Sequence, residues 1–221
     1  EELRTLKPHS GSTVKLVVQP PRPANDGDPV NVSAVNFGHE AWAARSPADR
    51  IVMSAYHIAH PDYASVHLYF AGHRELGEGM GASVGCWLHD GRFAHLRVIS
   101  AFLNGSSINV TLSEPATVDL HNVASVVGRG FVYEDDTETL IPSNFGIASD
   151  GMTISLTLPS APSGANPRLT IGSGAKFYDP GYGLGRLYGQ RTNLRALRPF
   201  AGSLTTFQPM FKWLTHQRIN L

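Results

Sequence analysis

Residues 83–100 have the sequence Ser-Val-Gly-Cys-Trp-Leu-His-Asp-Gly-Arg-Phe-Ala-His-Leu-Arg-Val-Ile-Ser, and they contain the clearest hairpin signal in the chain. Asp90-Gly91 lies between two apolar runs, and this dipeptide favours a tight turn in which both central residues need positive φ. After the turn, alternate residues fall on opposite faces of an extended chain, with one face formed by Leu96, Val98 and Ser100. The stretch therefore predicts two paired strands.

Alternation with a period of two also occurs on both sides of this stretch. Upstream, Val66, Leu68 and Phe70 share one face, and downstream Met152–Leu158 is the best single strand, with Ile154, Leu156 and Leu158 on one face. Asn104-Gly105 predicts another hairpin turn. Further strands are expected at 14–18, 30–37, 51–58, 108–112, 117–127 and 168–171. A flexible glycine-rich connection is expected at 72–85, a short helix around Trp42 within 39–49, and a turn of helix at 193–197.

Length and composition fit one globular domain. The chain has 221 residues, of which 42% are hydrophobic and 16% charged, so it can bury a core and is not disordered by composition. The 22 glycines and 15 prolines suit many short strands joined by turns. About eight strands with frequent turn signals are typical of an all-β sandwich, jelly roll or barrel.

The single cysteine, Cys86, excludes an internal disulfide framework and favours a cytoplasmic origin. No apolar run is long enough to span a bilayer. The chain begins Glu-Glu-Leu, which we interpret as the start of a processed product.

Charge is unevenly distributed along the chain, although the formal net charge is zero. From Gly151 onward there are eight bases and one acid, which gives this segment +7 and the remainder −7. The excess of bases predicts one of three settings for this segment: contact with a polyanion such as RNA, contact with an acidic neighbour, or a face exposed to solvent. Aromatic residues are interleaved with four of its bases, which are the candidate RNA or subunit contacts: Arg186, Arg191, Arg195 and Arg198.

Candidate catalytic chemistry is weak in this sequence. His57 and His60, with His67, His73 and Glu75, could supply metal ligands, but on a strand the first two point to opposite faces. Cys86 is flanked by apolar residues and is expected to be a packed structural cysteine rather than a nucleophile. The chain has no Gly-x-Ser-x-Gly elbow and no phosphate-binding Gly-Lys-Ser/Thr loop. We therefore expect no enzymatic activity, no cofactor and no metal site.

Four local segments resemble the capsid proteins of picorna-like, positive-strand RNA viruses of the insect-virus kind. The segment at Glu2, Glu-Leu-Arg-Thr-Leu-Lys-Pro, resembles the stretch that precedes the barrel in such subunits, and Tyr63-Ala-Ser-Val-His-Leu-Tyr-Phe resembles one of their strands. Val118-Asp-Leu-His-Asn-Val occupies the place of another strand. Lys176-Phe-Tyr-Asp-Pro-Gly-Tyr lies where those subunits end the barrel and begin a C-terminal tail.

The resemblance implies an eight-stranded antiparallel jelly-roll sandwich with extended termini. It divides residues 1–221 into an N-terminal extension at 1–13, a β-sandwich at 14–178 and a C-terminal extension at 179–221. It further implies a structural subunit that assembles with other capsid subunits, identical or different, into an icosahedral shell around viral RNA. The expected location is the virion, with assembly in the host cytoplasm.

Two other functions remain open on the sequence. One is a carbohydrate-binding β-sandwich module in which Trp42, Trp87, Tyr63 or Tyr69 stacks on sugar rings. The other is a metal-dependent, cupin-like jelly-roll enzyme that uses His57, His67, His73 and Glu75.

Overall fold

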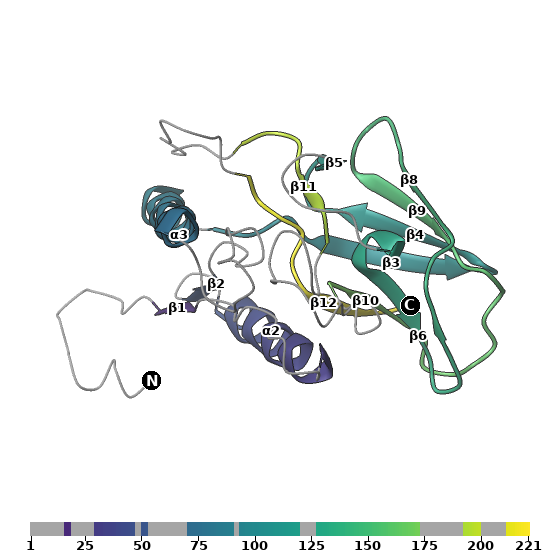
Figure 1. Cartoon of the computed structure of the whole chain (residues 1–221). Helices are drawn as coiled ribbons and strands as arrows, with labels where there is room; N and C mark the ends of the chain where they lie inside the picture. The colour runs from purple at the N-terminus through teal and green to yellow at the C-terminus, as the bar shows by residue number, and fades with distance from the viewer. Residues whose placement is uncertain are drawn as a thin grey trace.

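The computed structural model describes residues 16–18, 29–46, 50–52, 70–90, 93–119, 127–172, 192–199 and 211–221. Over these residues the protein is an all-β, sandwich-like fold of antiparallel sheets, with two helices to one side of the sheets (Figure 1). The predicted fold class is confirmed at this level.

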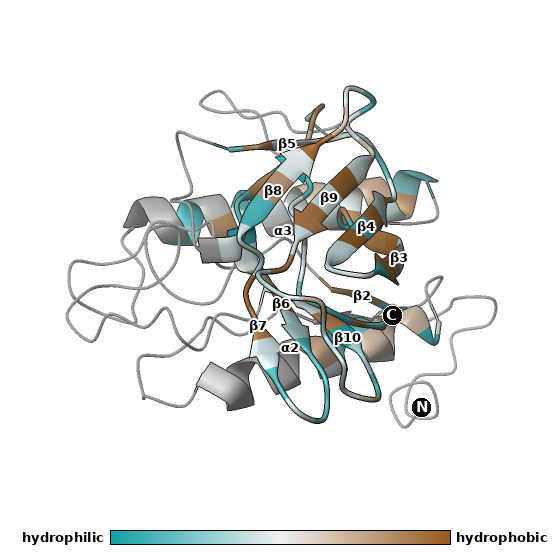
Figure 2. Cartoon of the chain, turned by 90° about the vertical axis from the view of Figure 1, so that its right-hand side faces the viewer, coloured by the Kyte–Doolittle hydropathy of each residue, from teal (hydrophilic) through white to brown (hydrophobic). Residues whose placement is uncertain are grey.

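Two four-stranded sheets, antiparallel throughout, form the body of the fold. The first has the order β3 (Val98–Asn104), β4 (Ser107–Leu112), β9 (Thr153–Thr157) and β8 (Asn144–Ile147). The second has the order β12 (Gln217–Asn220), β10 (Arg168–Ile171), β6 (Phe131–Glu134) and β7 (Thr139–Leu140). Figure 2 shows the first sheet toward the viewer, with β8, β9, β4 and β3 side by side.

The described residues also form two smaller strand pairs and one 3-10 turn. β11 (Leu194–Ala196) pairs antiparallel with β5 (Ala116–Val118), and β1 (Leu16–Val18) pairs parallel with β2 (Arg50–Val52). The 3-10 turn η2 (Val127–Gly130) leads into β6.

The hydrophobic core lies between the two large sheets. Alternate residues of β4 and β9 point into it, which is why Ile108, Val110, Ile154 and Leu156 are completely buried. From the second sheet they meet a set of equally buried side chains: Phe131, Tyr133, Leu169 and Ile171. The alternation that predicted the strand at Met152–Leu158 is therefore confirmed, together with the inward face it assigned.

The Asn104-Gly105 turn is confirmed as the connection between β3 and β4. Gly105 has φ of +58°, a conformation that L side chains rarely adopt, so the glycine suits this two-strand turn. Asn104 pairs with Ser107 directly beyond it. The predicted strands at 14–18, 108–112 and 168–171 are also confirmed, within a residue or two at each end.

Two helices replace segments predicted as strands or loops. α2 (Pro29–Ala44) includes the predicted short helix around Trp42, but also the predicted strand at 30–37, which is wrong. α3 (Phe70–Asp90) covers the predicted connection at 72–85 and the whole first strand of the predicted 83–100 hairpin, so these two predictions are wrong as well. Residues 93–97 carry only an isolated bridge, from Leu96 to Leu214, before β3 begins.

Residues 70–90 form a helix because their buried residues recur every four positions, which places them on one side of a helix. Gly79, Ser83 and Trp87 lie one turn apart and are all buried, so the helix packs along one line. The Ser83 hydroxyl donates to the carbonyl of Gly79 over 2.7 Å, which keeps this polar group satisfied inside the contact. A glycine that directly follows a helix, as Gly91 follows Asp90, is also a common helix stop. The Asp-Gly sequence is therefore compatible with a helix end as well as with the predicted hairpin turn.

The C-terminal region also differs from the prediction. The predicted turn of helix at 193–197 is the strand β11, and β12 is an edge strand of the second large sheet. Because both lie inside the segment predicted as an extension at 179–221, the predicted end of the sandwich at residue 178 is too early. The predicted N-terminal extension, the strand around Val66 and the segment that begins at Lys176 lie outside the described residues, apart from Phe70, which begins α3.

Candidate functional site

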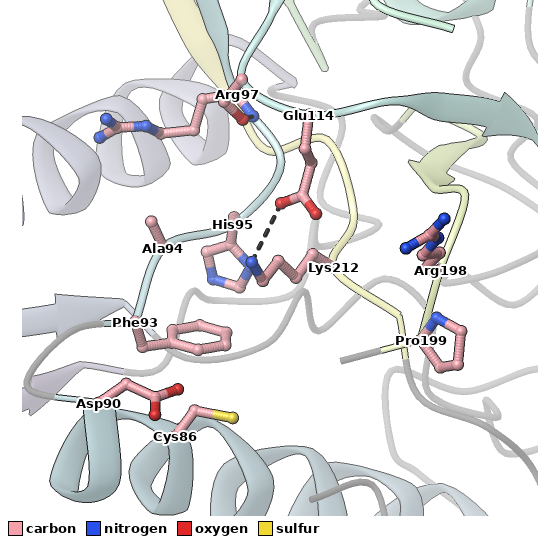
Figure 3. Close-up of a pocket in the computed structure, with 11 residues that line it drawn as sticks. Cys86, Asp90, Phe93, Ala94, His95, Arg97, Glu114, Arg198, Pro199 and Lys212 are labelled. Carbon is pink, nitrogen blue, oxygen red and sulfur yellow. Dashed lines mark hydrogen bonds and ion pairs between the residues drawn. The ribbon is translucent and has the colours of Figure 1, made fainter. Parts of the chain in front are cut away.

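A pocket of about 440 Å³ lies between the end of α3, residues 93–97 and the C-terminal segments (Figure 3). Cys86 and Asp90 of α3 form one wall, and Arg198, Pro199 and Lys212 form the opposite one. The lining also includes His95, so the pocket combines a thiol, a carboxylate and an imidazole, the side chains that acid–base or nucleophilic catalysis uses.

His95 has a structural partner in this pocket. Its Nε2 donates to the backbone carbonyl of Val52 over 2.9 Å, and its ring meets Phe93 edge-on at 5.1 Å between centroids. A carbonyl oxygen can only accept, so the hydrogen bond fixes the proton on Nε2. The imidazole thereby links residues 93–97 to β2, and it is buried.

Cys86 is unsuited to act as a nucleophile. Desolvation raises the pKa of the Cys86 thiol, the negative charge of Asp90 raises it further, and the ammonium of Lys212 opposes these effects only in part. The thiol is therefore the dominant form at neutral pH, and the thiolate that nucleophilic attack requires is scarce. The expected structural role is kept, although this cysteine lies half-buried on a helix and not on a strand.

The charged groups around the pocket are largely committed to neighbours. The ammonium of Lys212 lies 3.1 Å from Oε1 of Glu114, as the dashed line in Figure 3 marks. The carboxylate of Asp90 accepts from Nδ1 of His89 over 2.7 Å. The described lining thus offers ion pairs and packing contacts, without a nucleophile held against a base.

The four arginines predicted to contact RNA or a subunit have different settings. Arg186 and Arg191 lie outside the described residues, and Arg198 is exposed beside the pocket. Arg195 instead donates from Nε to Oδ2 of Asp119 over 2.9 Å, and its guanidinium lies 3.7 Å above the ring of Phe211. The charge of Arg195 is therefore paired inside the fold, and the RNA or subunit contact predicted for it stays a prediction.

The candidate metal ligands are not brought together in the described residues. His57, His60 and His67 lie outside them, whereas His73 is exposed on α3 and Glu75 belongs to the same helix. Across the described ranges, no three His, Cys, Asp or Glu side chains are placed to hold a metal ion.

The aromatic residues proposed to stack on sugars are also placed differently. Trp87 is 1% exposed and belongs to the buried stripe of α3, so it cannot meet a ligand. Trp42 lies under the guanidinium of Arg50, 5.1 Å from the ring centroid, and Tyr63 and Tyr69 lie outside the described residues. Phe102 on β3 is 65% exposed and was not predicted, although the alternation along 98–104 could have placed it opposite Leu103.

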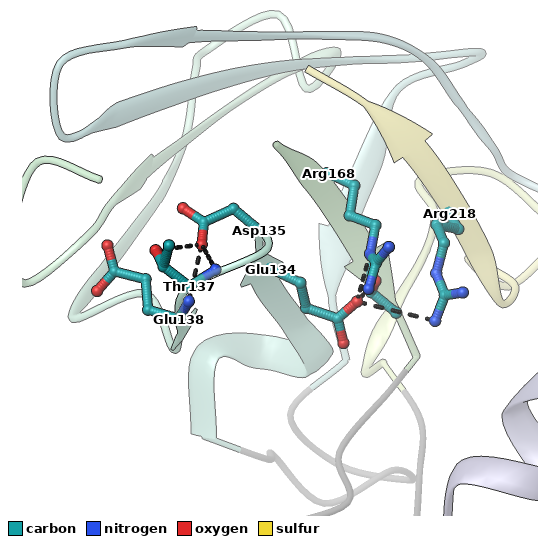
Figure 4. A network of polar contacts seen from close by, with 7 residues as sticks. Glu134, Asp135, Thr137, Glu138, Arg168 and Arg218 are labelled. Atoms are coloured by element: carbon teal, nitrogen blue, oxygen red, sulfur yellow. Dashed lines mark hydrogen bonds and ion pairs between the residues drawn. The ribbon is translucent and has the colours of Figure 1, made fainter. Parts of the chain in front are cut away.

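Two carboxylates hold the second sheet and its loops (Figure 4). Glu134 accepts from Arg168 over 2.9 Å and from Thr170 over 3.0 Å, and Arg218 lies 3.8 Å away, so one carboxylate links three neighbouring strands. Asp135 accepts from a larger set of donors: both the backbone and hydroxyl of Thr137, the backbone of Glu138, the hydroxyl of Tyr133 and the backbone of Gly164. Desolvation raises the pKa of Asp135, but these hydrogen bonds outweigh it and hold the pKa well below the usual value. Both groups stabilise the fold and are saturated by internal donors.

The chain matches no protein-family model and no curated protein. Among solved structures, it is similar to a carbohydrate acetylesterase from Xanthomonas citri, with a TM-score of 0.60 and 11% identity over 98% of this chain and 43% of the esterase chain. It is also similar to the S-layer protein SbsC, with a TM-score of 0.31 and 19% identity over 61% of this chain and 18% of that protein. A TM-score this low does not establish a shared fold. The chain spans less than half the length of either protein. The likeness to the esterase supports the sandwich-like fold alone.

In the described part of the chain, neither helix combines the length and the apolar character that crossing a membrane requires.

Proposed function

We propose that this chain is a structural capsid subunit, which assembles with copies or relatives of itself into a closed shell around viral RNA and carries out no reaction. The observation that carries the proposal is the outward face of α3. In its central part, residues 77–88, the exposed residues are small or apolar, whereas exposed polar residues lie at its two ends. The composition of the central part suits contact with another protein better than contact with water.

Three glycines make this face smooth. Gly77, Gly81 and Gly85 lie one turn apart, all three are exposed, and a Cβ added at any of them would meet nothing within 4 Å. Glycine inside a helix costs roughly 0.5–1 kcal/mol relative to alanine, so three in one exposed line make the isolated helix weaker. A line without side chains allows a second backbone to approach closely, which offsets that cost only when a partner is present.

Large apolar side chains adjoin the same line. Leu88 is 67% exposed and Met80 is 41% exposed, whereas the opposite side of the helix buries Trp87. An exposed apolar strip on a long helix is a common mark of a protein interface. The helix therefore has two packed faces in the proposed assembly, one toward its own chain and one toward a neighbour.

The edge of β3 gives further support. β3 is an edge strand whose sequence, Val98-Ile-Ser-Ala-Phe-Leu-Asn, contains neither charge nor proline, the devices that usually protect an edge from pairing with another chain. Within the part of the chain that the structure describes, the side chain of Gln217 caps the start of this edge. Of the four arginines predicted to contact RNA or subunits, Arg198 is the described one with an exposed side chain and keeps that role in the proposal.

The test is assembly of the purified protein, measured by mass photometry and electron microscopy for wild type, Gly81→Glu and Leu88→Glu. We expect particles for wild type and their loss in both variants. Glutamate is a better helix former than glycine, so loss of particles in Gly81→Glu cannot be explained by unfolding of α3. Arg74→Ala is the control, because it removes an exposed side chain whose Nε contacts Glu78 on the same helix and is expected to assemble normally. A monodisperse wild-type monomer, or particles that contain no nuclease-protected RNA, would contradict the proposal.

A further inference from the structure

The outward face of the first large sheet has a composition unlike an ordinary solvated surface. Its strands place eleven residues on this face, and none of them is charged: Ser100, Phe102, Asn104, Ser107, Asn109, Thr111, Asn144, Gly146, Thr153, Ser155 and Thr157. All are exposed except Thr111 and Thr153, which are half-buried. Charged residues make up 16% of this chain and concentrate on surfaces, so one or two are expected among eleven outward residues, and this face has none.

The strand register brings the central residues of this face into one transverse row. Phe102 is opposite Asn109, Asn109 is opposite Ser155, and Ser155 is opposite Gly146. The Ser155 hydroxyl lies 3.3 Å from the Asn109 side-chain oxygen, so the two polar groups are coupled across the strands. Neighbouring strands are about 4.8 Å apart, which gives the row a length of roughly 14 Å. Figure 2 shows these four strands side by side, turned toward the viewer.

We propose that this face binds an uncharged glycan, with Phe102 as the stacking platform and Asn109 and Ser155 as the hydrogen-bonding groups. A sugar ring presents C–H groups on one side and hydroxyls around its edge. The Phe102 ring offers an apolar surface for the former, and the amide and hydroxyl groups offer donors and acceptors for the latter. Gly146 ends the row without a side chain, which leaves the backbone of β8 open to a ligand laid across the sheet.

The chemistry of the face disfavours other occupants. Nucleic acid is held mainly by lysine and arginine on its phosphates, and this face has neither. A second copy of the chain would need apolar area at the centre of a contact, whereas the central row has one large apolar side chain, Phe102. The other exposed large apolar side chain of β3, Ile99, lies at the bulge near the start of the strand. The glycan site uses side chains on the outward face of the first sheet, whereas the proposed shell uses α3 and the backbone edge of β3. Substitutions of Phe102 and Asn109 leave α3 and that backbone edge in place.

The experiment is affinity electrophoresis of the full chain, produced in bacteria so that Asn104 and Asn109, both in Asn-x-Ser/Thr sequences, carry no sugar. The gels contain laminarin, dextran, mannan or galactan as neutral probes, and heparin or single-stranded RNA as charged ones. We expect retardation by at least one neutral polysaccharide and a loss of affinity of about tenfold or more in Phe102→Ala and in Asn109→Ala. Leu197→Ala, which removes another exposed apolar side chain, is the matched control and should bind as wild type does.

The proposal is overturned if no neutral polysaccharide retards the wild-type chain, if Phe102→Ala is retarded equally, or if only heparin or RNA retards it. Mass photometry of the same variants separates the two proposals. A wild-type chain that is retarded by a neutral polysaccharide but forms no particles contradicts the shell alone, and loss of retardation in variants that still assemble is the result expected for a separate glycan site.

Discussion

Arg195 and Asp119 form an ion pair of 2.9 Å between residues 76 positions apart, and the carboxylate is almost fully buried, with 2% of the side chain exposed. The pair joins β11 to the residue that follows β5, so it fastens the C-terminal segment to the body of the fold. Phe211 covers the guanidinium from the other side. Arg195, which the sequence predicted to contact RNA or a subunit, thus stabilises the fold by joining two segments that are distant in the chain.

Arg195→Ala should lower the free energy of unfolding by about 3 kcal/mol, because it leaves the buried Asp119 carboxylate without its partner. Arg198→Ala removes an exposed arginine three residues away and should change stability by less than about 0.5 kcal/mol. Urea denaturation of the two variants measures both values. If Arg195→Ala were as stable as wild type and instead bound RNA less tightly, the role assigned to this arginine would be wrong.

Glu40 on α2 should make stability depend on pH. Desolvation raises the pKa of Glu40 to about 7, and Thr215 and the charge of Arg97 lower it without cancelling that effect. The carboxyl keeps its proton in the fold at a pH where the unfolded chain has lost it. The contribution is therefore fully present below about pH 4.5 and is lost as pH rises through about 7.

Glu40→Gln should remove this pH dependence, which we expect to be on the order of 2 kcal/mol because part of the side chain remains exposed. The measurement is the urea midpoint of wild type and variant from pH 4.5 to 8. Glu78→Gln, on the exposed side of α3, is the control. A wild-type midpoint that rises over this range, with the Gln variant unchanged beside it, is the opposite of what we expect.

Gly164→Ala should destabilise the loop that approaches β6. A Cβ at this position would lie within van der Waals overlap of the Asp135 carboxylate, which already accepts the backbone N–H of Gly164 over 3.1 Å. Forced shifts of this kind typically cost 1–3 kcal/mol. Thermal unfolding followed by circular dichroism should show a lower midpoint for Gly164→Ala and little change for Gly146→Ala, whose Cβ would meet nothing within 4 Å. Equal midpoints would show that the carboxylate can move aside freely.

Gln217→Ala should both destabilise the sandwich and expose the edge of β3. The Gln217 side chain accepts the backbone N–H of Val98 over 2.8 Å and donates to its carbonyl over 3.3 Å, as a neighbouring strand would do. Loss of the two bonds should cost about 1–2 kcal/mol and increase aggregation, measured by denaturation and by light scattering. Gln217→Glu keeps the acceptor alone and should fall between wild type and alanine. Unchanged aggregation of the alanine variant would show that this edge is protected by other means.

The sequence alone determined the strands whose pattern is local. Ile154 and Leu156 alternate with polar residues, and that alternation is enough to define a strand with one buried face, because neighbouring side chains on a strand point to opposite sides. Gly105 likewise determined the β3–β4 turn, since its positive φ suits a central position of the two-residue turn that it forms with Ser106. The all-β class followed from several such patterns and is confirmed.

Tertiary structure decided what local pattern could not. Asp90-Gly91 suits a hairpin or a helix end, and the burial of Gly79, Ser83 and Trp87 along one line selects the helix. Arg195 could have faced solvent, RNA or its own chain, and only the approach of Asp119 from 76 residues away determines which. The outward row of Phe102, Asn109 and Ser155 likewise exists only through the pairing of three strands. The physical reason is that partners far apart in the chain leave no trace in local periodicity, although they decide burial, charge pairing and the composition of a surface.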